Sequence, residues 1–123
     1  METKVKENIQ VVEKVWGREE ILVNNGLYCG KLLHIDKGAV SSIHYHKIKQ
    51  ETFYAISGQI GMMIDNKDYM MNPYSRPKTV IPGVIHEFRG FSNNAVLLEI
   101  STVDKAEDSY RITKSQPAPV REG

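Results

Sequence analysis

Residues 38–58 read GAVSSIHYHKIKQETFYAISG and place Gly38, His44, His46, Glu51 and Gly58 at a distinctive spacing. Residues two apart on a strand point to the same face about 6.6 Å apart, so His44 and His46 can turn both imidazoles toward one point. A short loop then reverses the chain, and we expect Glu51 to bring a carboxylate from the neighbouring strand. Gly38 and Gly58 suit the flanking turns, where a positive φ is unstrained only for glycine. The segment therefore predicts short strands that carry a metal site.

A third imidazole follows in the stretch IPGVIH, which ends at His86 after a Pro-Gly turn. Three neutral imidazoles and one carboxylate suit a divalent first-row ion and leave coordination positions open. We therefore expect one divalent transition metal, Zn, Fe, Mn or Ni, bound by His44, His46, Glu51 and His86. His34 is a lone strand histidine, and we assign it to hydrogen bonding rather than to the metal.

Outward from this motif, short apolar stretches alternate with turn signals, which is the pattern of an all-β domain. The expected strands span residues 11–16, 20–23, 27–35, 42–46, 52–56, 59–64, 69–71, 80–82, 86–89 and 95–102. Short strands at this spacing predict a sandwich or a closed barrel. The pairs Met62-Met63 and Met70-Met71 lie on the arms of a predicted hairpin, and we expect one methionine of each pair to face inward.

The chain has 123 residues with 16 basic and 15 acidic side chains, a net charge of +1. This length predicts one domain, divided into an N-terminal extension 1–10, a barrel 11–115 and a flexible tail 116–123. Without a basic stripe, a nearly neutral chain argues against nucleic acid as a partner. Neither a signal peptide nor a membrane span is predicted, and the single cysteine, Cys29, can form no internal disulfide. We therefore expect a cytoplasmic protein, and we assign Cys29 no role.

The motifs around His44 and His86 resemble the two signature motifs of the cupin superfamily, over about residues 11–112. That resemblance implies a double-stranded β-helix, the jelly-roll barrel of cupins. More narrowly, VWGRE at 15–19, IPG at 81–83 and LLEI at 97–100 resemble the cupin domain of type II mannose-6-phosphate isomerases. This narrower resemblance implies a metal-assisted isomerase or epimerase that acts on a sugar or sugar phosphate.

Three functions remain open for such a barrel. In a sugar isomerase a base moves a proton between adjacent carbons, and the candidate catalytic residues are Glu51, Glu99 and Lys31, with Glu87 as a further candidate. A histidine-rich set with a carboxylate is also typical of non-haem iron dioxygenases. The third alternative is a non-catalytic module that binds metal or carbohydrate.

The expected partner is a small molecule, a carbohydrate in the first hypothesis. Five basic residues near the motif loops are candidate ligands for a substrate phosphate: Lys47, Lys49, Arg76, Lys78 and Arg89. Cupin barrels commonly cover their edge strands by pairing, so we expect a homodimer with contacts from residues 11–23. No membrane partner is expected.

Overall fold

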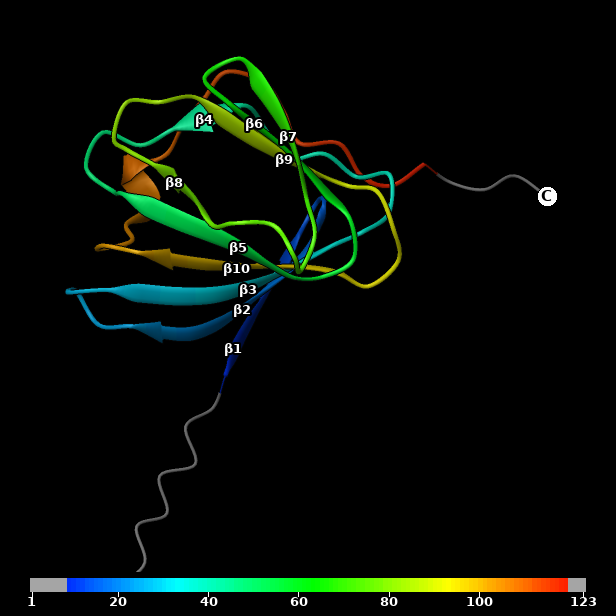
Figure 1. Cartoon of the computed structure of the whole chain (residues 1–123). Coiled ribbons are helices and arrows are strands. Elements are labelled where there is room, and N and C mark those ends of the chain that lie inside the picture. The colour runs from blue at the N-terminus through cyan, green and yellow to red at the C-terminus, as the bar shows by residue number, and fades with distance from the viewer. Residues whose placement is uncertain (1–8, 120–123) are drawn as a thin grey trace, which may run out of the picture.

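The computed structural model describes residues 9–119, which form a β-barrel (Figure 1). Within these residues the strands are β1 (Gln10–Lys14), β2 (Gly17–Asn24), β3 (Cys29–Ile35), β4 (His44–Tyr45), β5 (Glu51–Ser57), β6 (Ile60–Ile64), β7 (Lys67–Met71), β8 (Lys78–Val80), β9 (His86–Gly90), β10 (Ala95–Ser101) and β11 (Tyr110–Arg111). One turn of 3-10 helix, η1 (Ala106–Asp108), precedes the last strand. The predicted all-β class is confirmed.

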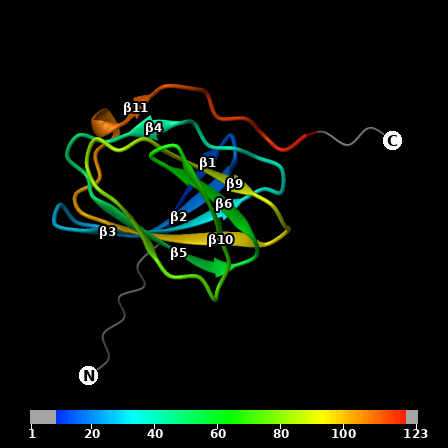
Figure 2. The same cartoon turned by 45° about the horizontal axis from the view of Figure 1, so that its top comes forward.

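The strands form two antiparallel sheets that face each other across the core (Figure 2). The six-stranded sheet has the order β1-β2-β3-β10-β5-β8, and the five-stranded sheet has the order β11-β4-β9-β6-β7. From β3 onward the chain passes repeatedly between the sheets, as it does in a jelly-roll barrel. Inward-facing apolar side chains form the core: Trp16, Leu33, Ile35, Ala39, Phe53, Ala55, Ile60, Met62, Met71, Val80, Phe88, Ala95 and Leu97.

The two glycines of the first motif hold left-handed turns, as predicted. Gly38 has φ 91° and Gly58 has φ 76°. A Cβ atom at Gly58 would also lie 2.8 Å from Cα of Ala95, so glycine is required there for space as well as for conformation. The β6–β7 hairpin turns through Asp65 and Asn66, whose φ values of 52° and 64° are those of a two-residue type I′ turn.

Both methionine pairs of this hairpin alternate as predicted. Met62 and Met71 are buried in the core, whereas Met63 is half-buried and Met70 is exposed. The alternation fixes which face of β6 and β7 points into the barrel.

The expected and observed strands differ mainly at their ends, but η1 and β11 were not predicted. Gln116, the first residue of the predicted tail, exchanges two backbone hydrogen bonds with Val40, at 3.0 and 2.8 Å. Contacts with the barrel therefore continue past the predicted boundary at residue 115. Residues 1–8 and 120–123, which belong to the predicted extension and tail, lie outside the described residues. Among the residues described, no helix has the length and apolar character to cross a bilayer.

Candidate metal centre

Three histidines converge where β4 and β9 pair. His44 in β4 lies opposite His86 in β9, and His46 directly follows β4. One ring nitrogen of each histidine lies within 4.8 Å of the others, so a single metal ion can contact all three. The structure thus brings together the three histidines that the two motifs singled out.

Hydrogen bonds on the far side of each ring fix the imidazole tautomers. In all three histidines Nδ1 lies 2.8 to 3.0 Å from a backbone oxygen, and the accepting residues are Ser42, Asp108 and Val84. Because a carbonyl oxygen can only accept, Nδ1 carries the proton and Nε2 keeps its lone pair. Metal-binding histidines are typically oriented in this way, through a bond made by the nitrogen that does not touch the metal.

Glu51 reaches the same point from the start of β5. Its Oε1 atom lies 3.2 Å from Nε2 of His46 and 3.0 Å from Nε2 of His86. Neither contact has the geometry of a hydrogen bond, so these three atoms are buried without a hydrogen-bond partner. Buried polar atoms without partners are costly, and a cation between them would satisfy all three. The prediction that Glu51 comes from a strand next to β4 is wrong. The chain crosses to the facing sheet between β4 and β5, so Glu51 reaches the histidines from across the barrel.

The charges of this set fit a divalent ion. Burial acts to raise the pKa of Glu51, but the imidazoles of His46 and His86 and the Lys49 ammonium lower it by more. The net pKa lies well below the ordinary value, so the carboxylate is ionised at neutral pH. Burial and the charge of His86 lower the pKa of His44 to about 4, so its ring is neutral. Against the effect of burial, Glu51 raises the pKa of His46, and a metal ion would compete with a proton there.

Asp108 in η1 positions both His46 and the loop that follows it. Its backbone oxygen accepts the bond from His46, and its carboxylate accepts bonds of 2.9 to 3.2 Å from the backbone N–H groups of residues 47–49. Although burial acts in the opposite direction, these bonds lower the pKa of Asp108. Asp108 was not predicted from the sequence, because 62 positions separate it from His46 and no local motif marks it.

Lys49 carries a buried ammonium group beside the metal set. Its Nζ atom lies 3.5 Å from Oε2 of Glu51 and 3.2 Å from Oε2 of Glu99. A third carboxylate, that of Asp104, lies 2.8 Å away. Together these negative groups raise the pKa of Lys49 despite its burial, so the ammonium stays charged.

Glu99 and Lys31 lie opposite each other on the inner face of the six-stranded sheet, where β10 pairs with β3. Burial and the charge of Glu51 raise the pKa of Glu99 to about 7, which is the range in which a carboxyl group can both take up and release protons. Lys31 lies 2.9 Å from Asp104 and 3.5 Å from Glu19. Its pKa is raised although burial lowers it, so Lys31 is a cation rather than a base at neutral pH.

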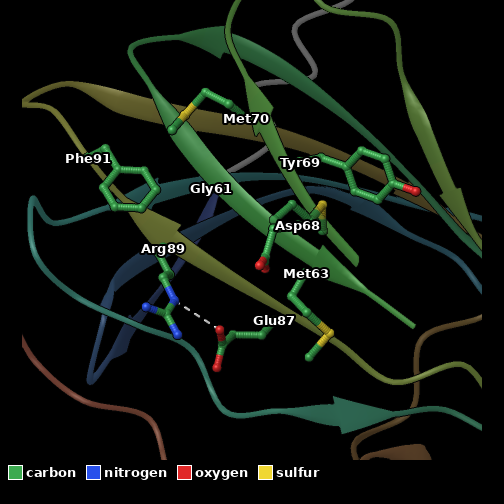
Figure 3. Close-up of a pocket in the computed structure, with 9 residues that line it drawn as sticks. Gly61, Met63, Asp68, Tyr69, Met70, Glu87, Arg89 and Phe91 are labelled. Atoms are coloured by element: carbon green, nitrogen blue, oxygen red, sulfur yellow. Dashed lines mark hydrogen bonds and ion pairs between the residues drawn. The ribbon is translucent and has the colours of Figure 1, made fainter. Parts of the chain in front are cut away.

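Glu87 points away from this site. It follows His86 directly in β9, so its side chain leaves the opposite face of the sheet. There it accepts a hydrogen bond of 3.0 Å from Nε of Arg89, in a groove of about 470 Å³ that Met70 and Phe91 also line (Figure 3). This placement removes Glu87 from the candidate bases.

Four of the five basic residues considered for phosphate have contacts in different places: Lys47, Lys49, Lys78 and Arg89. The ammonium groups of Lys47 and Lys78 lie 4.4 and 4.3 Å from the ring centres of tyrosine side chains. Arg89 is on the outer face with Glu87. Of these candidates, Lys49 is the one whose charge lies beside Glu51.

The two residues left out of the site both lie in β3. His34 contacts the carboxylate of Glu20, in keeping with a hydrogen-bonding role. Cys29 is buried within β3 as a free thiol. Neither side chain touches the three converging histidines.

No protein-family model matches the chain, and no curated protein sequence matches it. Solved structures match it in fold. KdgF from Halomonas has a TM-score of 0.71 at 14% identity, over 83% of this chain and 91% of that one. A nucleoside dehydratase from Streptomyces, solved with uridine, has a TM-score of 0.74 at 14% identity, over 92% and 93%. A putative sugar phosphate isomerase from Acidithiobacillus ferrooxidans has a TM-score of 0.55 at 20% identity, over 62% and 50%.

These structural neighbours are cupin-type proteins, and their low identity makes the likeness one of fold. The same fold follows from the two facing sheets and from the passage of the chain between them. The chain therefore has the double-stranded β-helix of the cupin-type barrels.

Proposed function

We propose that this protein is a metal-dependent isomerase or epimerase acting on a sugar or sugar phosphate. The observation that carries the proposal is the convergence of His44, His46 and His86 on one point, together with three buried atoms that lack hydrogen-bond partners. These atoms are Nε2 of His46, Nε2 of His86 and Oε1 of Glu51, and they lie near the Glu99 carboxyl group, whose pKa is raised to about 7. Aldose-ketose interconversion needs both parts, because a proton must leave a carbon while negative charge develops on the neighbouring oxygen.

The four side chains of this set would hold the metal. When bound, a divalent ion supplies a Lewis acid that polarises a substrate carbonyl. Glu99 is the proton carrier in this proposal, since its carboxyl group is the member of the buried cluster whose pKa lies near 7. Lys49 lies between Glu99 and Glu51 and holds both carboxylates in position. Lys31 stays cationic, so it attracts negatively charged groups and does not transfer protons.

Two structural neighbours support a carbohydrate-type substrate. One is a putative sugar phosphate isomerase, and the other is a nucleoside dehydratase that was solved with uridine. Both names describe chemistry on sugar-containing small molecules, which is the substrate class proposed here.

The test is exchange of the C2 proton of aldoses and aldose phosphates for deuterium in heavy water, with Mn, Zn or Fe added. We expect metal-dependent exchange that Glu99→Gln reduces at least 100-fold while metal content stays at one ion per chain, because only the proton carrier is lost. Glu51→Gln should instead reduce metal content. Cys29→Ser is the matched control, since this buried thiol lies on the same inner face, and exchange should persist in it.

A metal-replete protein without exchange on hexoses, pentoses or their phosphates would contradict the isomerase proposal. If that protein consumed oxygen in a metal-dependent way on an organic substrate, the site would belong to the dioxygenase alternative. Carbohydrate binding with neither reaction would assign the barrel to the non-catalytic alternative.

A further inference from the structure

Two buried lysines share one carboxylate inside the barrel. The ammonium group of Lys49 lies 2.8 Å from Oδ1 of Asp104, and that of Lys31 lies 2.9 Å from Oδ2. The two lysine side chains are only 6% and 8% exposed. Each oxygen of the carboxylate thus has its own cation, which is how proteins commonly hold a carboxylate or phosphate group.

Asp104 differs from the other carboxylates around these lysines. Glu19, Glu51 and Glu99 project from the strands β2, β5 and β10. Asp104 instead lies in the irregular segment between β10 and η1, and its side chain is 21% exposed. It can therefore leave the lysines without breaking a strand.

The paired lysines also lie beside the metal set. Nζ of Lys49 is 3.5 Å from Oε2 of Glu51, whose other oxygen faces His46 and His86. A small anionic group held by the lysines would consequently lie next to the atoms that face the metal position.

We propose that Lys31 and Lys49 form a subsite for the acidic group of the substrate, and that Asp104 fills this subsite until the substrate replaces it. The proposal rests on the proposed function for the identity of the ligand as an acidic sugar, either phosphorylated or carboxylated. It makes Asp104 a competing intramolecular anion, and it makes the lysines determinants of specificity.

The exchange of one anion for another keeps both lysines paired. Removal of Asp104 without a replacement leaves two buried cations short of one negative charge, which is strongly unfavourable in a protein interior. A tethered carboxylate competes at an effective concentration on the order of millimolar. Free anions should therefore bind the wild-type protein weakly and bind a variant without Asp104 at least about 10-fold more tightly.

The experiment uses metal-free protein with inorganic phosphate and with glycolate as separate probes, at constant pH and ionic strength. We expect Asp104→Ala to have a lower Tm than the wild type, and added probe to raise that Tm in a saturable way. The wild type should show a much smaller shift at the same concentration. The probe that shifts the Tm more distinguishes a phosphorylated from a carboxylated substrate.

Two further variants control for general loss of charge. Glu19→Ala removes a carboxylate that lies 3.5 Å from Lys31 but leaves Asp104 in place, so it should gain no anion binding. Lys31→Met combined with Asp104→Ala should abolish the gain. If Asp104→Ala does not fold, Asp104→Asn is measured in the same way, because the amide preserves the side-chain volume.

A folded Asp104 variant that binds neither probe better than the wild type would overturn the subsite. Equal gains in Glu19→Ala and Asp104→Ala would overturn it as well, since any loss of negative charge would then suffice. Because metal-free protein is used, failure of anion binding is separate from failure of the isomerase reaction. Anion binding without proton exchange would likewise refute the proposed reaction and leave the subsite standing.

Discussion

Asp108→Ala should weaken the metal centre without touching a metal ligand. The carboxylate of Asp108 accepts bonds from the N–H groups of residues 47–49, and the backbone oxygen of the same residue orients His46. Hydrogen bonds to a charged group each contribute about 1.5 to 3 kcal/mol. Water can reach part of this loop, because Ile48 is 61% exposed, so we take a total loss of about 2 to 4 kcal/mol rather than the full sum.

The same substitution should lower metal affinity about 10- to 100-fold, the range usual for groups that orient a ligand. In this variant the backbone oxygen of residue 108 remains, but the carboxylate that ties this segment to residues 47–49 is lost, so the oxygen orients the His46 ring less firmly. Urea unfolding of the metal-free protein measures the stability term, and calorimetric titration with Zn or Mn measures the affinity. Asp68→Ala is the control, because Asp68 is exposed and lines the outer groove of the five-stranded sheet.

The pH dependence of this effect has a definite sign. The folded-state pKa of Asp108 lies below its ordinary value of 3.8, so the ionised carboxylate stabilises the fold above that pH and the stabilisation is lost on acidification. The difference between wild type and Asp108→Ala should therefore shrink as the pH falls below about 4. If Asp108→Ala matched Asp68→Ala in both stability and metal affinity at pH 7, the organising role of Asp108 would be refuted.

Three further predictions concern stability and association. In metal-free protein, folding raises the pKa of Glu99 from 4.5 to about 7, so the folded state holds a proton that the unfolded state releases. The free energy of unfolding should therefore fall by up to about 3 kcal/mol as the pH rises through that window. Glu99→Gln should remove this pH dependence in denaturant unfolding, and equal slopes for the two proteins would contradict it. Gly58→Ala should lower the free energy of unfolding, measured in urea, by about 2 kcal/mol or more, because it combines a positive φ with a backbone clash. Gly26→Ala should cost less, since a Cβ atom there would meet nothing within 4 Å. A smaller loss at Gly58 than at Gly26 would count against the clash. We also propose a homodimer that uses the edge strand β1, where Val11 is 52% exposed. Sedimentation at tens of micromolar should show a dimer, and Val11→Lys should weaken it. A wild-type monomer at this concentration would rule the dimer out.

The three histidines could be identified from sequence because their signals are local. Strand alternation places His44 and His46 on one side, and glycines with positive φ mark the flanking turns at Gly38 and Gly58. The same alternation could have excluded Glu87, which must face away from His86 in any strand that contains both. Lys49 was a candidate from its place near the motif loops, but it lies outside β5, so alternation does not predict its contact with Glu51.

Other parts of the site have no local signal. Asp108 acts through a single turn of helix that follows an irregular segment, and its contacts cross 59 to 62 positions of the sequence. Asp104 and Lys31 meet because β3 and β10 pair, a choice of partner that hydrophobic alternation does not specify. The strand β11 contains two residues, which is too short for any periodicity to appear.

The inner face of the barrel is divided into an apolar and a polar half, and the division follows the strand register. In β3 and β10, Leu33 pairs with Leu97 in one layer, and Lys31 pairs with Glu99 in the next layer. Replacing a buried ion network by apolar side chains is often neutral or stabilising, so stability alone does not explain why the core changes character there. The polar half is the one that reaches Glu51 and, through it, His46 and His86. The buried charges are therefore best explained by chemistry at the metal position, which is why the lysines and Glu99, rather than the apolar core, are the positions at which substitution should change function while the fold persists.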